Sequence, residues 1–91
     1  MQVEFDSAKD RANQRKHGVS LAAAAEMDFL AAQIVRDDRR DYGEARFRAC
    51  GWIGGRLHML VFTLGGDVLR AISLRKANDR ERRRHEQDVR T

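Results

Sequence analysis

The stretch from Arg46 to Lys76 constrains the fold most, because two Gly-Gly pairs divide it into three strand-like runs. Gly54-Gly55 and Gly65-Gly66 are strong hairpin signals, since both residues of such a pair tolerate a positive φ. The three runs read RFRACGWI, RLHMLVFT and DVLRAISLRK. The stretch therefore predicts a three-stranded antiparallel meander joined by two tight turns.

Turns of two residues determine the register of this meander. They place two pairs opposite one another at the turns: Ile53 with Arg56, and Leu64 with Asp67. Counting back from the turns, Val61 pairs with Arg48 on one side and with Arg70 on the other. A slip of one residue would exchange the two faces, so this register decides which side chains are buried.

Side chains alternate between the two faces of the meander. One face is mostly apolar and is expected to pack on helices: Phe47, Ala49, Gly51, Ile53, Leu60, Phe62, Leu69 and Ala71, with Arg56, His58, Ser73 and Arg75 at one end. The other face carries arginines around one threonine: Arg46, Arg48, Cys50, Trp52, Leu57, Met59, Val61, Thr63, Arg70, Ile72 and Leu74. Neighbouring strand cations repel one another. This second face is therefore either a solvated surface or a surface that binds an anion.

Two helices are expected before the meander. Asp6 can cap a polar helix that runs to about His17 and ends at Gly18, a typical C′ residue. Ser20 can cap a second, mostly apolar helix over residues 21–32, which we expect to lie against the sheet. The remaining strand candidates are residues 3–5 and 33–36.

A highly charged helix is expected at the end of the chain. Asn78 can cap it, and Glu81 at the third helical position completes a capping box. The helix lacks an apolar stripe, so it lies in solvent or leans on a partner. The predicted fold class is α+β: two N-terminal helices, a mainly antiparallel sheet and a C-terminal helix in one domain, residues 1–91.

The composition points toward nucleic acid. The net charge is +4, and of 18 basic residues only those at positions 9, 16 and 76 are lysine. Arginine favours planar, bidentate recognition of phosphate, although an arginine-rich proteome would give the same bias. Cys50 is the single cysteine, and there is no run of 18 apolar residues. We therefore expect a soluble protein in the reducing cytoplasm.

No metal or other cofactor is expected. Residues 37–44 are rich in carboxylates, but their spacing does not match an EF-hand loop. The histidines at positions 17, 58 and 85 do not have metal-ligand spacing either.

Three segments together carry a family resemblance: residues 3–20 with KHGVS, residues 37–63 with YGE and the GGR turn, and residues 69–86 with the IS-RKA ending. In this combination and order, the chain resembles the BrnT-type toxins of bacterial type II toxin–antitoxin systems. Two places depart from the family pattern: Phe5 stands where tryptophan is usual, and residues 21–24 are Leu-Ala-Ala-Ala instead of an acidic F-E-E-A-like run.

The resemblance implies a RelE-like fold, a ribonuclease that inhibits translation, an RNA substrate, and a BrnA-type antitoxin that neutralises the toxin in a hetero-oligomer. Metal-independent cleavage needs a base for the ribose 2′-OH, cations on the phosphate, and an acid for the leaving oxygen. Candidate catalytic residues are Lys16 and His17 for proton transfer, Glu44 as an alternative base or as a residue that orients an arginine, and Arg46, Arg70 and Arg75 as phosphate clamps. Further candidate RNA contacts are Arg48, Thr63 and Lys76.

Two other functions remain open at this point. Basic charge alone would suit a nucleic-acid-binding module without enzymatic activity. The charged last helix would suit an interaction protein that docks on an acidic partner. Lys16 and His17 also have a structural explanation, since cations in the last turn of a helix stabilise its macrodipole.

Overall fold

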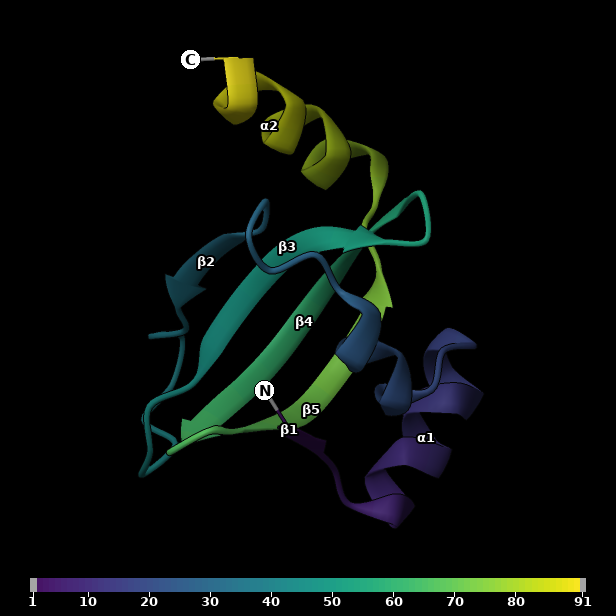
Figure 1. Ribbon diagram of the computed structural model, residues 1–91, viewed down its shortest axis with the longest axis vertical. Helices are drawn as coiled ribbons and strands as arrows, with labels where there is room; N and C mark the ends of the chain where they lie inside the picture. The colour runs from purple at the N-terminus through teal and green to yellow at the C-terminus, as the bar shows by residue number, and fades with distance from the viewer. Residues whose placement is uncertain (1, 91) are drawn as a thin grey trace.

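The computed structural model describes residues 2–90, and the side chains of residues 2–88. It contains one five-stranded sheet in the order β1-β5-β4-β3-β2, in which only β1 and β5 are parallel (Figure 1). In chain order the elements are β1 (Gln2–Glu4), α1 (Ser7–His17), the 3₁₀ helix η1 (Leu21–Glu26), β2 (Gln33–Arg36), β3 (Phe47–Ile53), β4 (Arg56–Gly65), β5 (Val68–Lys76) and α2 (Asp79–Arg90).

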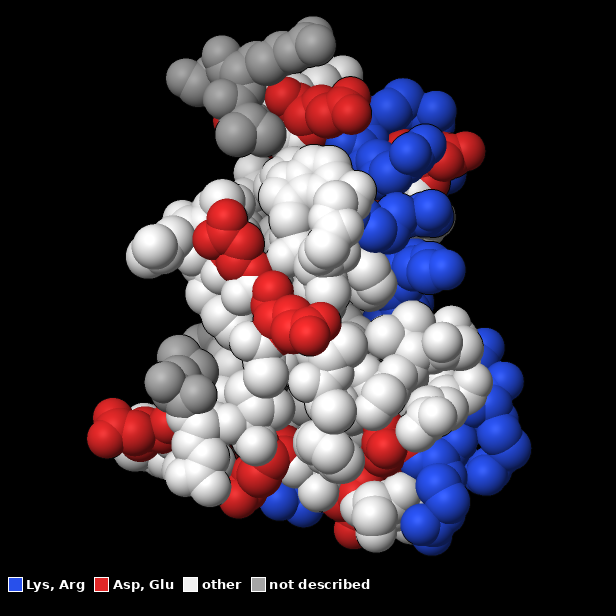
Figure 2. All heavy atoms as spheres, turned by 45° about the vertical axis from the view of Figure 1, so that its right-hand side comes forward, with Lys and Arg blue, Asp and Glu red and all other residues white. Residues whose placement is uncertain are grey.

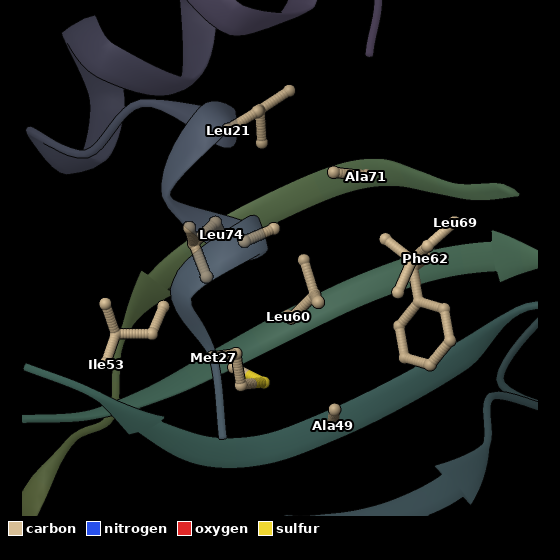
Figure 3. Packing of buried hydrophobic residues seen from close by; sticks show 10 residues of the cluster. Leu21, Met27, Ala49, Ile53, Leu60, Phe62, Leu69, Ala71 and Leu74 are labelled. Atoms are coloured by element: carbon tan, nitrogen blue, oxygen red, sulfur yellow. The ribbon is translucent and has the colours of Figure 1, made fainter. Parts of the chain in front are cut away.

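The hydrophobic core lies between η1 and one face of strands β3, β4 and β5 (Figure 3). Leu21 and Leu60 are fully buried at its centre, and Met27 reaches in from the segment after η1. Its other buried members are Ala24, Ala49, Ile53, Phe62, Leu69, Ala71 and Leu74. We call this the core face of the sheet, and the opposite face, which carries Arg48, Val61 and Thr63, the open face.

The first helix is confirmed at both ends. The Asp6 carboxylate accepts a hydrogen bond from the backbone N–H of Lys9 at 2.9 Å, as an N-cap does. Gly18 ends the helix with a φ of 72°, a left-handed conformation that glycine adopts without steric cost.

The second helix is much shorter than expected. Ser20 caps it as expected, but a 3₁₀ turn replaces the α-helix and the chain becomes extended at Met27 (φ −67°, ψ 136°). The Met27 side chain lies so close to Gly51 that a Cβ on this glycine would approach its Cγ to 2.9 Å. The N–H of Asp28 then donates to the carbonyl of Trp52 at 2.9 Å. These contacts with the sheet override the helix propensity of the alanine run.

The first hairpin has the expected register. Ile53 pairs with Arg56, and Arg48 pairs with Val61. Gly54 and Gly55 have φ values of 52° and 75°, so this turn needs two residues that tolerate the left-handed region.

The second hairpin turns one residue later than expected. Gly65 pairs with Val68, so the turn residues are Gly66, with a φ of 59°, and Asp67. Arg70 consequently pairs with Thr63 and not with Val61. The later turn removes the Asp67 carboxylate from a paired position on the core face and places leucines opposite one another there, Leu64 with Leu69.

A β-bulge in β5 overturns the expected facing of the residues that follow it. Phe62 pairs with Ala71, but the preceding Val61 pairs with Ser73, so Ile72 is an extra residue. Because of this insertion Leu74 enters the core, while Ser73 and Arg75 turn to the open face, the reverse of the expected assignment. The bulge exists because burying Leu74 is favourable, whereas an unbroken alternation would bury the Arg75 guanidinium.

The last helix follows the expected capping box. The Asn78 side chain accepts from the N–H of Glu81 at 2.8 Å, and the Glu81 carboxylate accepts from the N–H of Asn78 at 2.9 Å. The helix extends past one end of the sheet (Figure 1). Within the described residues no helix is long and apolar enough to cross a membrane.

Helix α1 is joined to the free edge of β5 by one buried amide. Asn13 donates to the carbonyl of Leu74 at 2.8 Å and accepts from the N–H of Leu74 at 3.1 Å, as a neighbouring strand would. It also donates to the carbonyl of Val19 at 2.8 Å. The amide therefore satisfies three backbone groups that the sheet and the loop leave unpaired.

We expect Asn13→Ala to lower the free energy of unfolding by about 2–3 kcal/mol, because the buried backbone groups of Leu74 would lose their partners. Chemical denaturation measures this loss. Gln14→Ala is the matched control, since Gln14 is exposed and, among the residues that the structure describes, its side chain bonds only to Asp10. Equal stabilities for the two variants would contradict the role of Asn13.

Candidate functional site

The open face carries an arginine in each of three successive rows across β3, β4 and β5. The first row holds Thr63 of β4 and Arg70 of β5. Arg46 immediately precedes β3, the strand that pairs with β4 on its other side. The next two rows are Arg48, Val61 and Ser73, then Cys50, Met59 and Arg75. The predicted cations Arg46, Arg48, Arg70 and Arg75 therefore share one face, which for Arg75 depends on the bulge at Ile72.

Arg70 has a carboxylate partner that sequence reasoning did not anticipate. Its guanidinium donates to Glu4 at 3.0 Å, since the parallel pairing of β1 with β5 sets Glu4 beside it. Both side chains are about half exposed. An ion pair in such a position contributes little to stability and can be exchanged for another anion.

Arg75 is held by a residue of the last helix. Its two terminal nitrogens donate to the two carboxylate oxygens of Glu81 at 2.8 and 2.9 Å. The bidentate bond lowers the pKa of Glu81, and the positive charge of Arg48 also contributes to that shift. One carboxylate therefore caps α2 and neutralises an open-face arginine.

Asp37 organises the loop between β2 and β3 from a buried position. Its carboxylate accepts from Arg39 Nε at 2.7 Å and Nη2 at 2.8 Å, and from the Tyr42 hydroxyl at 3.3 Å. Hydrogen bonding to Arg39 is the main cause that holds the pKa of Asp37 far below its usual range. From the sequence, residues 37–44 were considered as a metal site and Glu44 as a base, but Asp37 was given no role of its own. The missed signal was an aspartate directly after a strand and two residues before an arginine.

Arg46 and Arg48 lie next to this carboxylate. The Arg46 guanidinium carbon is 4.1 Å from the centre of the Tyr42 ring, a cation–π contact. Arg48 Nε lies 4.0 Å from the Asp37 carboxylate, which is attraction without a hydrogen bond. In the described part of the chain the Nε atoms of both arginines are buried and lack a hydrogen-bond partner. A buried donor without a partner is unfavourable, so the local structure leaves both arginines incompletely satisfied.

Lys16 and His17 border the same face from the edge of β5. They line a hollow of about 280 Å³ with Ile72 and Ser73. Burial lowers the pKa of His17, and the positive charges of Lys16 and Arg75 lower it further. The imidazole is therefore mainly neutral at neutral pH, the state in which it can take up a proton.

The two remaining candidate residues, Glu44 and Lys76, do not lie together. Glu44 is exposed and lines a hollow of about 610 Å³ with Thr63 and Arg70. Lys76 pairs with His58, so it belongs to the register of the core face and points away from the arginines.

A larger cleft of about 640 Å³ lies between α2 and the open face, along strands β2, β3 and β4. Arg48, Cys50 and Met59 form its floor. Burial raises the pKa of the Cys50 thiol, so this cysteine is a packed residue and not an activated nucleophile. The floor of the cleft therefore combines the apolar side chains of Cys50 and Met59 with an arginine of the open face.

From the sequence, five large apolar residues are expected at one end of the open face, Trp52, Leu57, Met59, Ile72 and Leu74, and the structure leaves fewer of them exposed there. Leu57 is buried at 1% exposure and Leu74 belongs to the core, whereas Trp52 remains 40% exposed. The Trp52 ring packs edge-to-face against His85 of α2, with centroids 6.2 Å apart. Lysines and arginines gather along one edge of the molecule, with an upper group over α2 (Figure 2). In residues 2–90 no group of three or more His, Cys, Asp or Glu side chains is placed to hold a metal ion.

The fold and this face define a small basic α+β domain with clustered arginines on an uncovered sheet. The comparisons with known proteins place it more narrowly. The chain belongs to the family described as "Ribonuclease toxin, BrnT, of type II toxin-antitoxin system", which it matches over residues 5–81. It is thus a member of a ribonuclease toxin family, as the sequence motifs indicated.

A solved structure agrees with this assignment. The fold is similar to the 1.1 Å crystal structure of the Brucella abortus ribonuclease toxin BrnT, with a TM-score of 0.70 and 26% sequence identity. The match covers 87% of this chain and 99% of that chain. No curated protein matches the chain. The RelE-like character of the fold stays a prediction.

Proposed function

We propose that this chain is a metal-independent endoribonuclease that binds RNA on the open face and thereby inhibits translation. The observation that carries the proposal is the bulge at Ile72, which turns Arg75 to the same face as Arg48 and Arg70. Several guanidinium groups facing one surface repel one another unless an anion lies between them. A phosphodiester backbone supplies such anions, and arginine binds them in a bidentate manner.

The reaction proposed is an attack of the ribose 2′-OH on the adjacent phosphate. His17 is neutral and takes the proton of the 2′-OH, with Glu44 as the alternative base. Open-face arginines hold the pentacoordinate phosphate, where negative charge is greatest. Lys16 donates the proton to the leaving 5′ oxygen. The products are a 2′,3′-cyclic phosphate and a 5′-OH.

The guanidinium groups can supply the positive charge that a metal ion supplies in other nucleases, so we expect cleavage of RNA in EDTA. We expect DNA of the same sequence to remain intact, since it lacks the 2′-OH.

Arg70→Ala should lower the cleavage rate by roughly a hundred- to a thousand-fold, the usual effect of removing a donor to a developing anion. Arg70→Lys should recover little, because an ammonium group cannot reproduce the bidentate fork.

Two controls separate this role from stability. Glu4→Gln removes the carboxylate that Arg70 binds. If Arg70 mattered only through this ion pair, Glu4→Gln would lose cleavage activity as Arg70→Ala does. Under the proposal Glu4→Gln keeps its activity. Arg83→Ala, at an exposed position of α2, should also cut at the parental rate. Circular dichroism verifies folding, and a folded Arg70→Ala that cuts normally would refute the phosphate clamp. Binding of RNA without cutting would favour the non-enzymatic module.

We also propose that a BrnA-type antitoxin neutralises the protein by covering the open face and its cleft. Trp52 is 40% exposed, and Val35 on the outer strand, which pairs with Arg48, is 53% exposed. Together with the 640 Å³ cleft they offer apolar surface beside the arginines. A partner on this surface excludes RNA directly.

Trp52 is the single tryptophan of the chain, so its fluorescence reports on this face. We expect a tryptophan-free antitoxin to shift the emission to shorter wavelength and to reduce quenching by acrylamide. Size-exclusion chromatography confirms that the complex has formed. A stable complex with unchanged quenching would show that the antitoxin binds elsewhere.

A further inference from the structure

The deepest carboxylate near the open face belongs to Asp37, which is 3% exposed although it lies in a polar loop. Its hydrogen bonds come from the Arg39 side chain, the Arg39 backbone and the Tyr42 hydroxyl. Its own N–H donates to the carbonyl of Arg46 at 2.7 Å. The residue is therefore bound through both its backbone and its side chain.

These bonds connect Asp37 with three arginines in different ways. The side chain of Arg39 is engaged twice by the carboxylate and is 59% exposed. Arg48 is attracted at 4.0 Å but not hydrogen-bonded to the carboxylate, and its side chain is 35% exposed, so part of it can be reached by a ligand. Arg46 is positioned indirectly, because Tyr42 donates to Asp37 and carries the guanidinium of Arg46 on its ring.

We propose that Asp37 is a positioning residue for RNA cleavage, which orients Arg39, Arg46 and Arg48 toward the substrate phosphate; this inference rests on the proposed function. Charge alone does not explain a carboxylate here, since a negative group beside three cations weakens their attraction for RNA. Its benefit is geometric. Catalysis depends on the placement of charged groups to within a fraction of an ångström, whereas RNA binding depends mainly on their total charge.

This division of roles predicts opposite effects of one substitution on binding and on catalysis. Asp37→Asn keeps the size of the side chain but removes the charge that holds Arg39 and attracts Arg48. We expect kcat to fall about ten- to a hundred-fold, the range caused by misplacement of catalytic groups. We expect KM to stay within about twofold or to decrease, because the surface gains one positive charge.

The experiment measures cleavage of an RNA oligonucleotide and the affinity for its uncleavable 2′-O-methyl analogue. Asp38→Asn is the matched control: it removes the same charge from the next residue, whose side chain is 75% exposed and forms an ion pair with Arg36. We expect this control to keep the parental kcat. Tyr42→Phe tests the hydrogen bond between Tyr42 and Asp37, since it deletes the hydroxyl but keeps the ring beneath Arg46. It should lower kcat less than Asp37→Asn does, again with unchanged KM.

The outcomes separate the inference from the function on which it rests. A lower kcat with an unchanged or lower KM supports the positioning role. A parental kcat in Asp37→Asn overturns it, and so does a loss of RNA affinity that parallels a loss of melting temperature, which would mean a structural role. If Asp37→Asn does not fold, Tyr42→Phe decides by the same two criteria. A parental protein that does not cut RNA refutes the proposed function, and the inference with it.

Discussion

The single inserted residue in β5 is the constraint on which the rest of the structure depends. Without the bulge at Ile72, strict alternation would direct Leu74 to the open face and Arg75 toward the core. The bulge buries Leu74 against Leu60 and turns the guanidinium outward. One local irregularity thus completes the hydrophobic core and gathers the arginines on one face. Bulges next to active sites commonly have this effect of redirecting a side chain.

Nearby carboxylates offset the mutual repulsion of the open-face arginines in the free protein. Glu4 binds Arg70 from a half-exposed position and Glu81 binds Arg75 from a partly exposed one, so an RNA phosphate can compete with both carboxylates. Asp37 differs, because its side chain is fully buried and a ligand cannot displace it. We therefore distinguish exchangeable partners, which neutralise arginines until the substrate arrives, from a permanent one that orients them.

Local signals in the sequence were sufficient for the parts of the fold that local chemistry determines. The caps at Asp6 and Gly18, the Asn78 capping box and the register across Gly54-Gly55 depend on residues close in the chain. The arginine face was also foreseen, apart from Arg75.

Tertiary contacts decided the features that were missed. The helix after Ser20 was shortened by contacts of Met27 with the sheet, and the Glu4–Arg70 pair joins residues 66 positions apart. The bulge left a trace in the sequence: Leu69, Ala71 and Leu74 are apolar but not spaced by two residues throughout. Placing all three on one face requires one inserted residue, which strict alternation does not allow.

The central claim is that RNA lies on the open face. It is tested most directly by following the arginine Nε–H resonances by NMR while a 2′-O-methyl RNA oligonucleotide is added. This analogue cannot be cleaved by 2′-OH attack. We expect the signals of Arg46, Arg48 and Arg75 to shift, while those of Arg82 and Arg83, exposed on α2, stay nearly unchanged. Shifts confined to α2, with the open-face arginines unaffected, would contradict it.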